Sequence, residues 1–89
     1  MSDPATIRLL FFSSLRDLAG VEEIDWPWPP VGGGEATVAG LLEEVWARWP
    51  ALRDWETRLL VAVDLAYADR STVVRAGQEV ALMPPVQGG

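Results

Sequence analysis

The first strand-like stretch of the chain, Thr6–Phe12, is rich in apolar residues of the types that favour strands. In an extended strand successive side chains point to opposite faces, so a two-residue period divides this stretch between two faces. One face would carry Ile7, Leu9 and Phe11, and the other would carry Arg8, Leu10 and Phe12. We therefore expect a strand with apolar residues on both of its faces.

A short helix and a second strand are expected next. Ser13-Ser14 offers an N-cap for a short helix that Gly20 ends. Val21–Trp26 then has the residue types of a strand. Residues 27–34 contain three prolines and three glycines, which predicts a loop.

The longest helix is predicted over Thr37–Trp49, with Thr37 as its N-cap and Pro50 as its stop. Its apolar side holds Val38, Leu41, Leu42, Val45, Trp46 and Trp49, and its charged side holds Glu43, Glu44 and Arg48. We therefore expect Trp46 and Trp49 in the core and the two glutamates in solvent. The pattern leaves Trp26 and Trp28 undecided between core and surface.

Three further stretches after that helix have the length of strands. Leu59–Val63 is a continuous apolar run suited to a central, doubly covered position, and Ser71–Val74 is a second candidate. Glu79–Met83 alternates into a final strand, with Ala81 and Met83 on the face opposite Val80 and Leu82. This order predicts one α+β domain over residues 1–89, a sheet with one main helix across one face. The predicted core includes Leu9, Leu42, Val45, Val61 and Leu82.

The composition excludes several kinds of catalytic and metal site, because cysteine and histidine are absent from the chain. The 89 residues are 49% hydrophobic and 22% charged, as in an ordinary globular domain. There is no Cys and no His, so iron–sulfur ligation, thiol catalysis, imidazole acid–base catalysis and ordinary zinc sites are excluded, and no metal site is expected. A chain without cysteine fits a reducing, cytoplasmic compartment most simply. We expect neither a secretory signal nor a membrane-spanning segment.

The formal net charge of −6 narrows the range of partners. Nucleic acid and anionic membranes would repel such a chain, so neither is an expected partner. A protein with a basic groove is the partner that this charge favours.

Residues 84–89 have the composition of a slender C-terminal tail that could enter a narrow channel of another protein. Pro84-Pro85 favours an extended polyproline conformation and cannot pair fully with a neighbouring strand. Gly88 and Gly89 lack a Cβ, so they can enter a channel that a side chain would block. We therefore expect a stiff base and a flexible tip that presents the α-carboxyl group of Gly89. A carboxylate is a poor electrophile until it is activated, so the chain is expected to be the substrate of an activating enzyme and not itself an enzyme.

Several stretches together resemble the family of molybdopterin synthase small subunits, which are sulfur carriers. The most specific is the ending Met83-Pro84-Pro85-Val86-Gln87-Gly88-Gly89, and the others are Arg8–Phe12, Leu15–Gly20, Thr37-Val38 and Val61–Asp64. The resemblance runs from about Thr6 to Gly89. The chain departs from the family in its longer Pro27–Gly34 loop and in Asp64, where the family often carries Asn.

The resemblance implies a ubiquitin-like β-grasp fold with a mixed sheet, and a sulfur-donating subunit that is not catalytic alone. An activating enzyme would use ATP to adenylate Gly89, and a sulfur donor would convert it to a thiocarboxylate. The tail, with Gly88 beside the reacting residue, would enter the large synthase subunit within a heterotetramer. Sulfur would pass to cyclic pyranopterin monophosphate during molybdenum cofactor biosynthesis, and the chain itself would bind no cofactor. Matching family positions imply contact with the large subunit at Phe12, Tyr67, Met83, Pro84, Pro85, Val86 and Gln87.

Other classes of function stay open. A thiamine-type sulfur carrier or a protein-conjugating ubiquitin-like modifier would use the same tail chemistry, although such relatives tend to lack the Pro-Pro-Val ending. A pure interaction module with an accidental Gly-Gly ending would keep its function when the tail is shortened. For Phe12, Tyr67 and Met83, core packing competes with an exposed interface, since a single helix covers only one face of a sheet.

Overall fold

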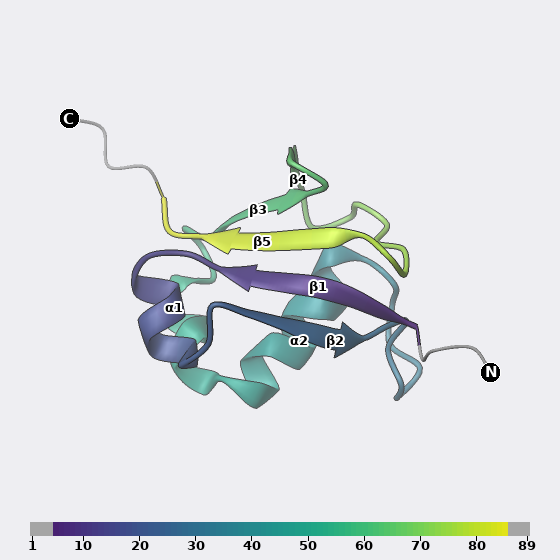
Figure 1. Cartoon of the computed structure of the whole chain (residues 1–89), viewed down its shortest axis with the longest axis horizontal. Coiled ribbons are helices and arrows are strands. Elements are labelled where there is room, and N and C mark those ends of the chain that lie inside the picture. Colours follow the sequence, from purple (N-terminus) through teal and green to yellow (C-terminus); the bar gives the residue numbers. More distant parts are fainter. Residues whose placement is uncertain (1–4, 86–89) are drawn as a thin grey trace.

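The structure, a computed structural model, describes residues 5–85. Its elements in order are β1 (Thr6–Phe11), α1 (Ser14–Ala19), β2 (Glu23–Pro27), α2 (Val38–Arg48), the 3₁₀ helix η1 (Pro50–Trp55), β3 (Leu60–Val63), β4 (Ala66–Ala68) and β5 (Glu79–Met83). The strands form one mixed sheet in the order β2-β1-β5-β3-β4. β1 and β5 are parallel neighbours near the middle, and the other pairs are antiparallel (Figure 1). The predicted α+β class is therefore confirmed.

The core lies between one face of this sheet and α2. The helix buries Val38, Leu41, Leu42, Val45 and Trp46, and the strands contribute Ile7, Leu9, Phe11, Val61, Val80 and Leu82. All five core residues predicted above are at most 3% exposed. Burying a large aliphatic side chain stabilises a fold by about 1.5–3 kcal/mol, so this layer is the main source of stability.

The tryptophans divide between the core and its border. Trp46 and Trp49 are buried, as predicted. Trp28 is buried too, and its indole Nε1 donates a hydrogen bond of 2.8 Å to the carbonyl oxygen of Val74. Trp26 is half-buried, and its Nε1 donates to the Glu44 carboxylate at 2.6 Å. The expectation that Glu44 is simply solvated is therefore wrong, because the carboxylate accepts a hydrogen bond from this indole.

The ends of both α-helices are set by local chemistry. The Thr37 hydroxyl accepts a hydrogen bond from the backbone N–H of Gly40 at 3.2 Å, which confirms Thr37 as an N-cap. Gly20 ends α1 in the left-handed region, at φ 78°. Ser13 precedes α1, but its side chain makes no capping bond. The N–H groups of Leu15 and Arg16 bond instead to the carbonyl groups of Phe12 and Ser13.

Several predicted boundaries were wrong. β2 begins at Glu23 instead of Val21 and includes Pro27. Ser71–Val74 is not a strand and forms only an isolated bridge from Val73 to Thr37, whereas β4 was missed. Leu59–Val63 was expected in a central, doubly covered position. β3 does lie inside the sheet, between β5 and β4, but α2 covers only one of its faces.

Candidate functional site

The candidate site begins where the central strand leads to the last residues of the chain. β5 lies between β1 and β3 and continues into Pro84 and Pro85, which are half-buried. The backbone N–H of Phe12 donates to the carbonyl of Leu82 at 3.1 Å, so β1 remains paired with β5 to within three residues of Pro85. The stem of the tail is therefore fixed to the most supported strand of the sheet. Val86, Gln87, Gly88 and Gly89 lie outside the described residues.

An apolar patch lies on the open face of the sheet beside this stem. One row across the strands pairs Leu10 with Ala81, Ala81 with Ala62, and Ala62 with Tyr67. The next row, nearer the stem, pairs Met83 with Leu60 and places Phe12 beside Met83. We call these seven residues the sheet patch: Leu10, Phe12, Leu60, Ala62, Tyr67, Ala81 and Met83. Because α2 covers the other face, the described part of the chain leaves this one uncovered.

The patch places three of the seven predicted contact residues, Phe12, Tyr67 and Met83, on one face. Phe12 is 45% exposed and Tyr67 is 74% exposed, while Met83 is half-buried between its neighbours. Phe12 and Tyr67 lie three strand spacings apart across the sheet and one row apart along it, about 16 Å in all, so one partner surface could cover both. Neither Phe12 nor Tyr67 is a core residue, so core packing is excluded for these two.

Sequence reasoning did not single out Leu10, Leu60, Ala62 and Ala81 as site residues. The two-residue period already placed Leu10 and Ala81 on the face opposite the core. Leu60 and Ala62 belong to a continuous apolar run, in which period alone cannot separate the two faces. Their assignment came only from the pairing of β3 with β5.

The far end of the same face is charged. Arg8 pairs with Glu79 and Asp25 across the sheet, and its Nε lies 3.3 Å from the Glu23 carboxylate. A hollow of about 300 Å³ opens there, lined by Thr6, Arg8, Asp25, Asp64, Gly77, Gln78 and Glu79. The Asp64 carboxylate accepts from the backbone N–H of Glu79 at 2.9 Å and from the Gln78 side chain at 3.0 Å, so it fixes the start of β5. The face is therefore apolar near the tail and polar away from it.

Among the described residues there is no cluster of potential metal ligands, and the pKa of Asp69 is clearly shifted. Within residues 5–85, no three acidic side chains lie together in a way that would hold a metal ion, and no helix is long and apolar enough to cross a membrane. The pKa of Asp69 is lowered because the side chain and backbone N–H of Ser71, together with Thr72, donate hydrogen bonds to its carboxylate. Those bonds close an exposed turn away from the sheet patch. What this arrangement offers is an apolar face beside the stem at Pro84 and Pro85.

Comparison with known proteins identifies the family. The family model described as ThiS matches residues 9–89. The chain belongs to the ThiS family. It is 34% identical over 86 residues to the molybdopterin synthase sulfur carrier subunit of Escherichia coli (strain K12), covering 93% of this chain and 99% of that protein. The subunit of the same name from Mycobacterium tuberculosis is 33% identical over 86 residues, covering 93% and 96%.

Solved structures of similar proteins place this ThiS family member among the β-grasp folds. Molybdopterin converting factor, subunit 1, from Pyrococcus furiosus superposes with a TM-score of 0.77 at 26% identity, covering 92% of this chain and 99% of that one. Small archaeal modifier protein 1 of Haloferax volcanii gives 0.74 at 25% identity, over 92% and 99%. A complex of subunits 1 and 2 of molybdopterin-converting factor from Helicobacter pylori gives 0.63 at 19% identity, over 94% and 99%, and this likeness concerns the fold alone. The predicted family and β-grasp fold are confirmed.

Proposed function

We propose that this chain is the sulfur carrier subunit of a molybdopterin synthase, and that the α-carboxyl group of Gly89 carries the sulfur. The observation that supports this most is the sheet patch beside the Pro84-Pro85 stem. A docking face next to the stem lets one partner hold the domain and receive the tail together. The relatives from Escherichia coli and Mycobacterium tuberculosis carry this function in their names.

The chemistry begins with activation of the carboxylate. One oxygen of the Gly89 carboxylate attacks the α-phosphorus of ATP on an activating enzyme, and pyrophosphate leaves. A donor that supplies sulfur at the oxidation level of sulfide then attacks the acyl carbon, and AMP leaves with the transferred oxygen. The product is a thiocarboxylate, in which sulfur has replaced one carboxyl oxygen. ATP is thus a substrate of the activating enzyme and not a cofactor of this chain.

The large synthase subunit is the proposed partner for delivery. Its apolar surface would cover the sheet patch, while a basic pocket would receive the tail, in keeping with the net charge of −6. The Helicobacter pylori complex of subunits 1 and 2 supports a pairing of this kind. Sulfur would pass from Gly89 to cyclic pyranopterin monophosphate, and water would regenerate the carboxylate. We place this heterotetrameric assembly in the cytoplasm.

Intact mass of the protein isolated from its native host tests the proposal. The expected result is a fraction of molecules heavier by one exchange of oxygen for sulfur, with fragmentation placing that change on Gly89. Mild hydrolysis should return the ordinary mass, because water replaces the sulfur. A protein that never carries this change in cells actively making molybdenum cofactor would contradict the proposal.

A protein-conjugating modifier is the second candidate. It is favoured by the likeness to small archaeal modifier protein 1 at 25% identity. A modifier would leave Gly89 in an amide bond to an amine of another protein. Denaturing separation of native-host extracts distinguishes the two, since conjugates survive it and a thiocarboxylate carrier stays at 9.7 kDa.

A further inference from the structure

The outer edge of β2 offers backbone groups to a further strand. β2 is an edge strand and pairs only with β1 among the described residues. In an antiparallel pair, hydrogen-bonded and non-hydrogen-bonded residue pairs alternate. The N–H of Phe11 donates to the carbonyl of Glu22, and the N–H of Trp28 donates to the carbonyl of Ala5. Every second residue of β2 between these two bonds, Ile24 and Trp26, therefore bonds to β1. The N–H and C=O groups of Glu23 and Asp25 therefore point outward. Pro27 has no N–H and ends the usable edge.

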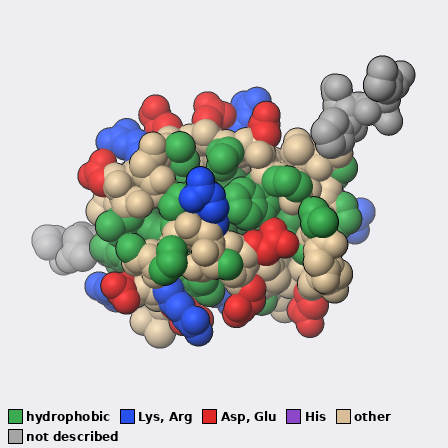
Figure 2. Space-filling model, turned by 90° about the horizontal axis from the view of Figure 1, so that it is seen from below, with side chains coloured by type: hydrophobic (Ala, Val, Ile, Leu, Met, Phe, Trp, Pro, Cys, Tyr) green, Lys and Arg blue, Asp and Glu red, His purple; other side chains and the backbone are tan. Residues whose placement is uncertain are grey.

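An apolar groove runs beside this edge on the side of α2. It has a volume of about 470 Å³ and is lined by Trp26, Pro27, Val31, Glu44, Ala47 and Arg48. Val31 is 86% exposed, and Ala47 is exposed on the outer side of α2. Figure 2 views the molecule from below relative to Figure 1, and on this face apolar side chains gather among arginines and carboxylates. The groove lies on the opposite side of the sheet from the sheet patch.

The groove wall is held in a fixed conformation. Trp26 bonds to Glu44 through its Nε1 and packs against Trp49 at a ring distance of 5.5 Å. Arg48 also lines the groove, and its guanidinium lies 5.1 Å from the centre of the Trp49 ring. A ligand would therefore meet a preformed apolar surface, with little side-chain ordering left to do.

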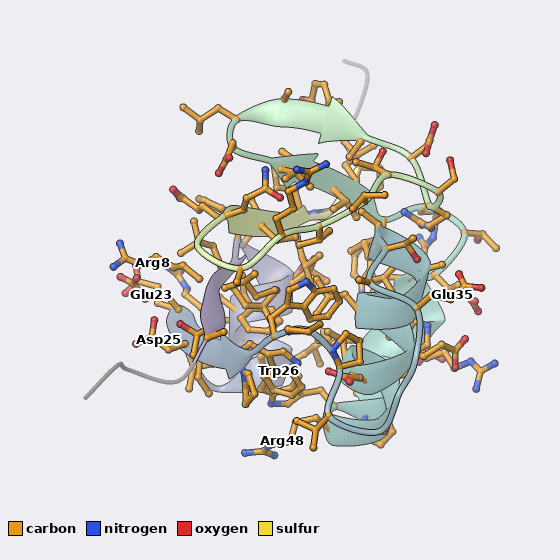
Figure 3. All side chains as sticks on the ribbon, turned by 90° about the vertical axis from the view of Figure 1, so that its right-hand side faces the viewer. Arg8, Glu23, Asp25, Trp26, Glu35 and Arg48 are labelled. Carbon is orange, nitrogen blue, oxygen red and sulfur yellow. The ribbon has the colours of Figure 1, made fainter. Side chains whose placement is uncertain are left out.

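The other face of β2 is acidic. Figure 3 shows Glu23 and Asp25 pointing away from α2, whereas Trp26 lies on the side of the helix. Glu23 pairs with Arg8, but Asp25 has no arginine within 4.0 Å among the described residues. A strand placed beside β2 would therefore meet an apolar surface on one face. On the other face it would meet two carboxylates, of which Asp25 has no ion pair among the described residues.

We propose that the β2 edge and this groove bind an extended segment of another protein in which apolar and basic residues alternate. The segment would add to the sheet as a further strand, bonding to the backbone of Glu23 and Asp25. Its apolar side chains, opposite Ile24 and Trp26, would fill the groove, and its basic side chains, opposite Glu23 and Asp25, would meet the carboxylates. The site is separate from the sheet patch and the tail stem, so it goes beyond sulfur delivery.

The test uses the full chain and a synthetic hexapeptide, Arg-Val-Arg-Leu-Arg-Val. Amide hydrogen exchange followed by NMR should show slowing at Glu23 and Asp25, whose N–H groups gain partners. The N–H groups of Ile24 and Trp26, already bonded to β1, should change little. Two control peptides should not produce this pattern: Arg-Arg-Arg-Val-Leu-Val, which has the same composition without alternation, and Glu-Val-Glu-Leu-Glu-Val, which has the opposite charge.

Two pairs of variants locate the binding. Ala47→Arg fills the groove and places a favourable Glu43–Arg pair on α2, so the helix stays folded while Kd rises about tenfold or more. Ala51→Arg, exposed on η1, is its matched control and should leave Kd within about twofold. Asp25→Arg should weaken binding, and Asp54→Arg on η1 should not.

Three results would overturn the proposal. The first is the absence of slowed exchange at Glu23 and Asp25 at millimolar peptide. The second is peptide binding that Ala47→Arg leaves unchanged. The third is slowed exchange at the same two amides without peptide that grows with protein concentration, because a second copy of the chain would then occupy the edge.

Discussion

Gly40 shows how one residue fixes the start of the main helix. A Cβ built on Gly40 would collide with the backbone carbonyl oxygen of Glu35. The same residue gives its N–H to the Thr37 cap. The close approach of residue 35 to the first turn of α2 therefore requires a residue without a side chain at position 40.

Gly40→Ala should lower the free energy of unfolding by about 1–3 kcal/mol. Alanine favours a helix over glycine by about 1 kcal/mol, but the backbone displacement at Glu35 should exceed that gain. Gly34→Ala is the matched control, because its Cβ would make only an ordinary contact with Pro30, so its effect should stay within about 0.5 kcal/mol. Urea unfolding measures both. Equal stability of the two variants would show that the 35–40 contact carries no constraint.

The sequence predicted the role of some single residues but not of others. Thr37 was recognised as a cap because an N-cap depends on neighbours only three residues away. The sequence did not decide the position of Trp28 and wrongly predicted a solvated Glu44, since their partners, Val74 and Trp26, are distant in the chain. Hydrogen bonds of that kind exist only after the sheet and helix have packed.

The turn between β3 and β4 is strained at the scale of an element. Val63 pairs with Ala66, so Asp64 and Leu65 form a two-residue hairpin loop. Both have positive φ, 49° and 71°, and Leu65 is 92% exposed. Loops of this geometry favour Asn-Gly or Asp-Gly, and a leucine there has no compensating burial.

Leu65→Gly should therefore raise the free energy of unfolding by about 1 kcal/mol, the cost of the left-handed conformation for a residue with a Cβ. Leu65→Ala keeps the Cβ and serves as the control, with no gain expected. Thermal unfolding of the three proteins gives the comparison. A gain from alanine equal to that from glycine would mean that exposed apolar surface, and not backbone strain, limits this hairpin.

This hairpin also explains why β4 escaped the sequence analysis. Its three residues are too few to show a period, and Asp64-Leu65 lacks the glycine that usually marks such a turn.

Pro50 was correctly identified as the end of α2, but proline also favours the first position of a helix, and η1 begins there. Ser71–Val74 has strand-like residues, yet Val74 instead bonds to Ala36 and is buried in the core.

At the scale of the whole molecule, the two faces of the sheet differ in burial. α2 and the buried face of the sheet hold the fold together, while the sheet patch on the open face is held only by the backbone pairing of the strands. Alternation along β1 and β5 predicted this division, because it placed Phe12 and Met83 out of phase with the core residues. The position of Tyr67 could not be predicted, since it depends on the missed strand β4.

Met83→Asp should weaken binding to the large subunit while the chain stays folded. A charge at the centre of the sheet patch removes an apolar contact at a site where anchor residues commonly contribute more than about 1 kcal/mol, and hot spots at least about 2. Calorimetric titration should show Kd raised about tenfold or more. Val73→Asp, at a residue that is 55% exposed outside the patch, is the control. Unchanged affinity in a folded Met83→Asp protein would argue against this face.

Removing Gly89 tests the sulfur-carrier proposal most directly. The deletion shortens the tail by about 3.5 Å, and a misplacement of about 1 Å can already cost 100-fold in rate. Gly88→Val keeps the chain length and should fail similarly by blocking the channel. The measurement is molybdopterin formation from the pyranopterin precursor, with chemically thiocarboxylated protein and the large subunit. Full-length protein should support the conversion, and protein lacking Gly89 should not, at equal thermal stability. Conversion at the normal rate without Gly89 would contradict the sulfur-carrier function.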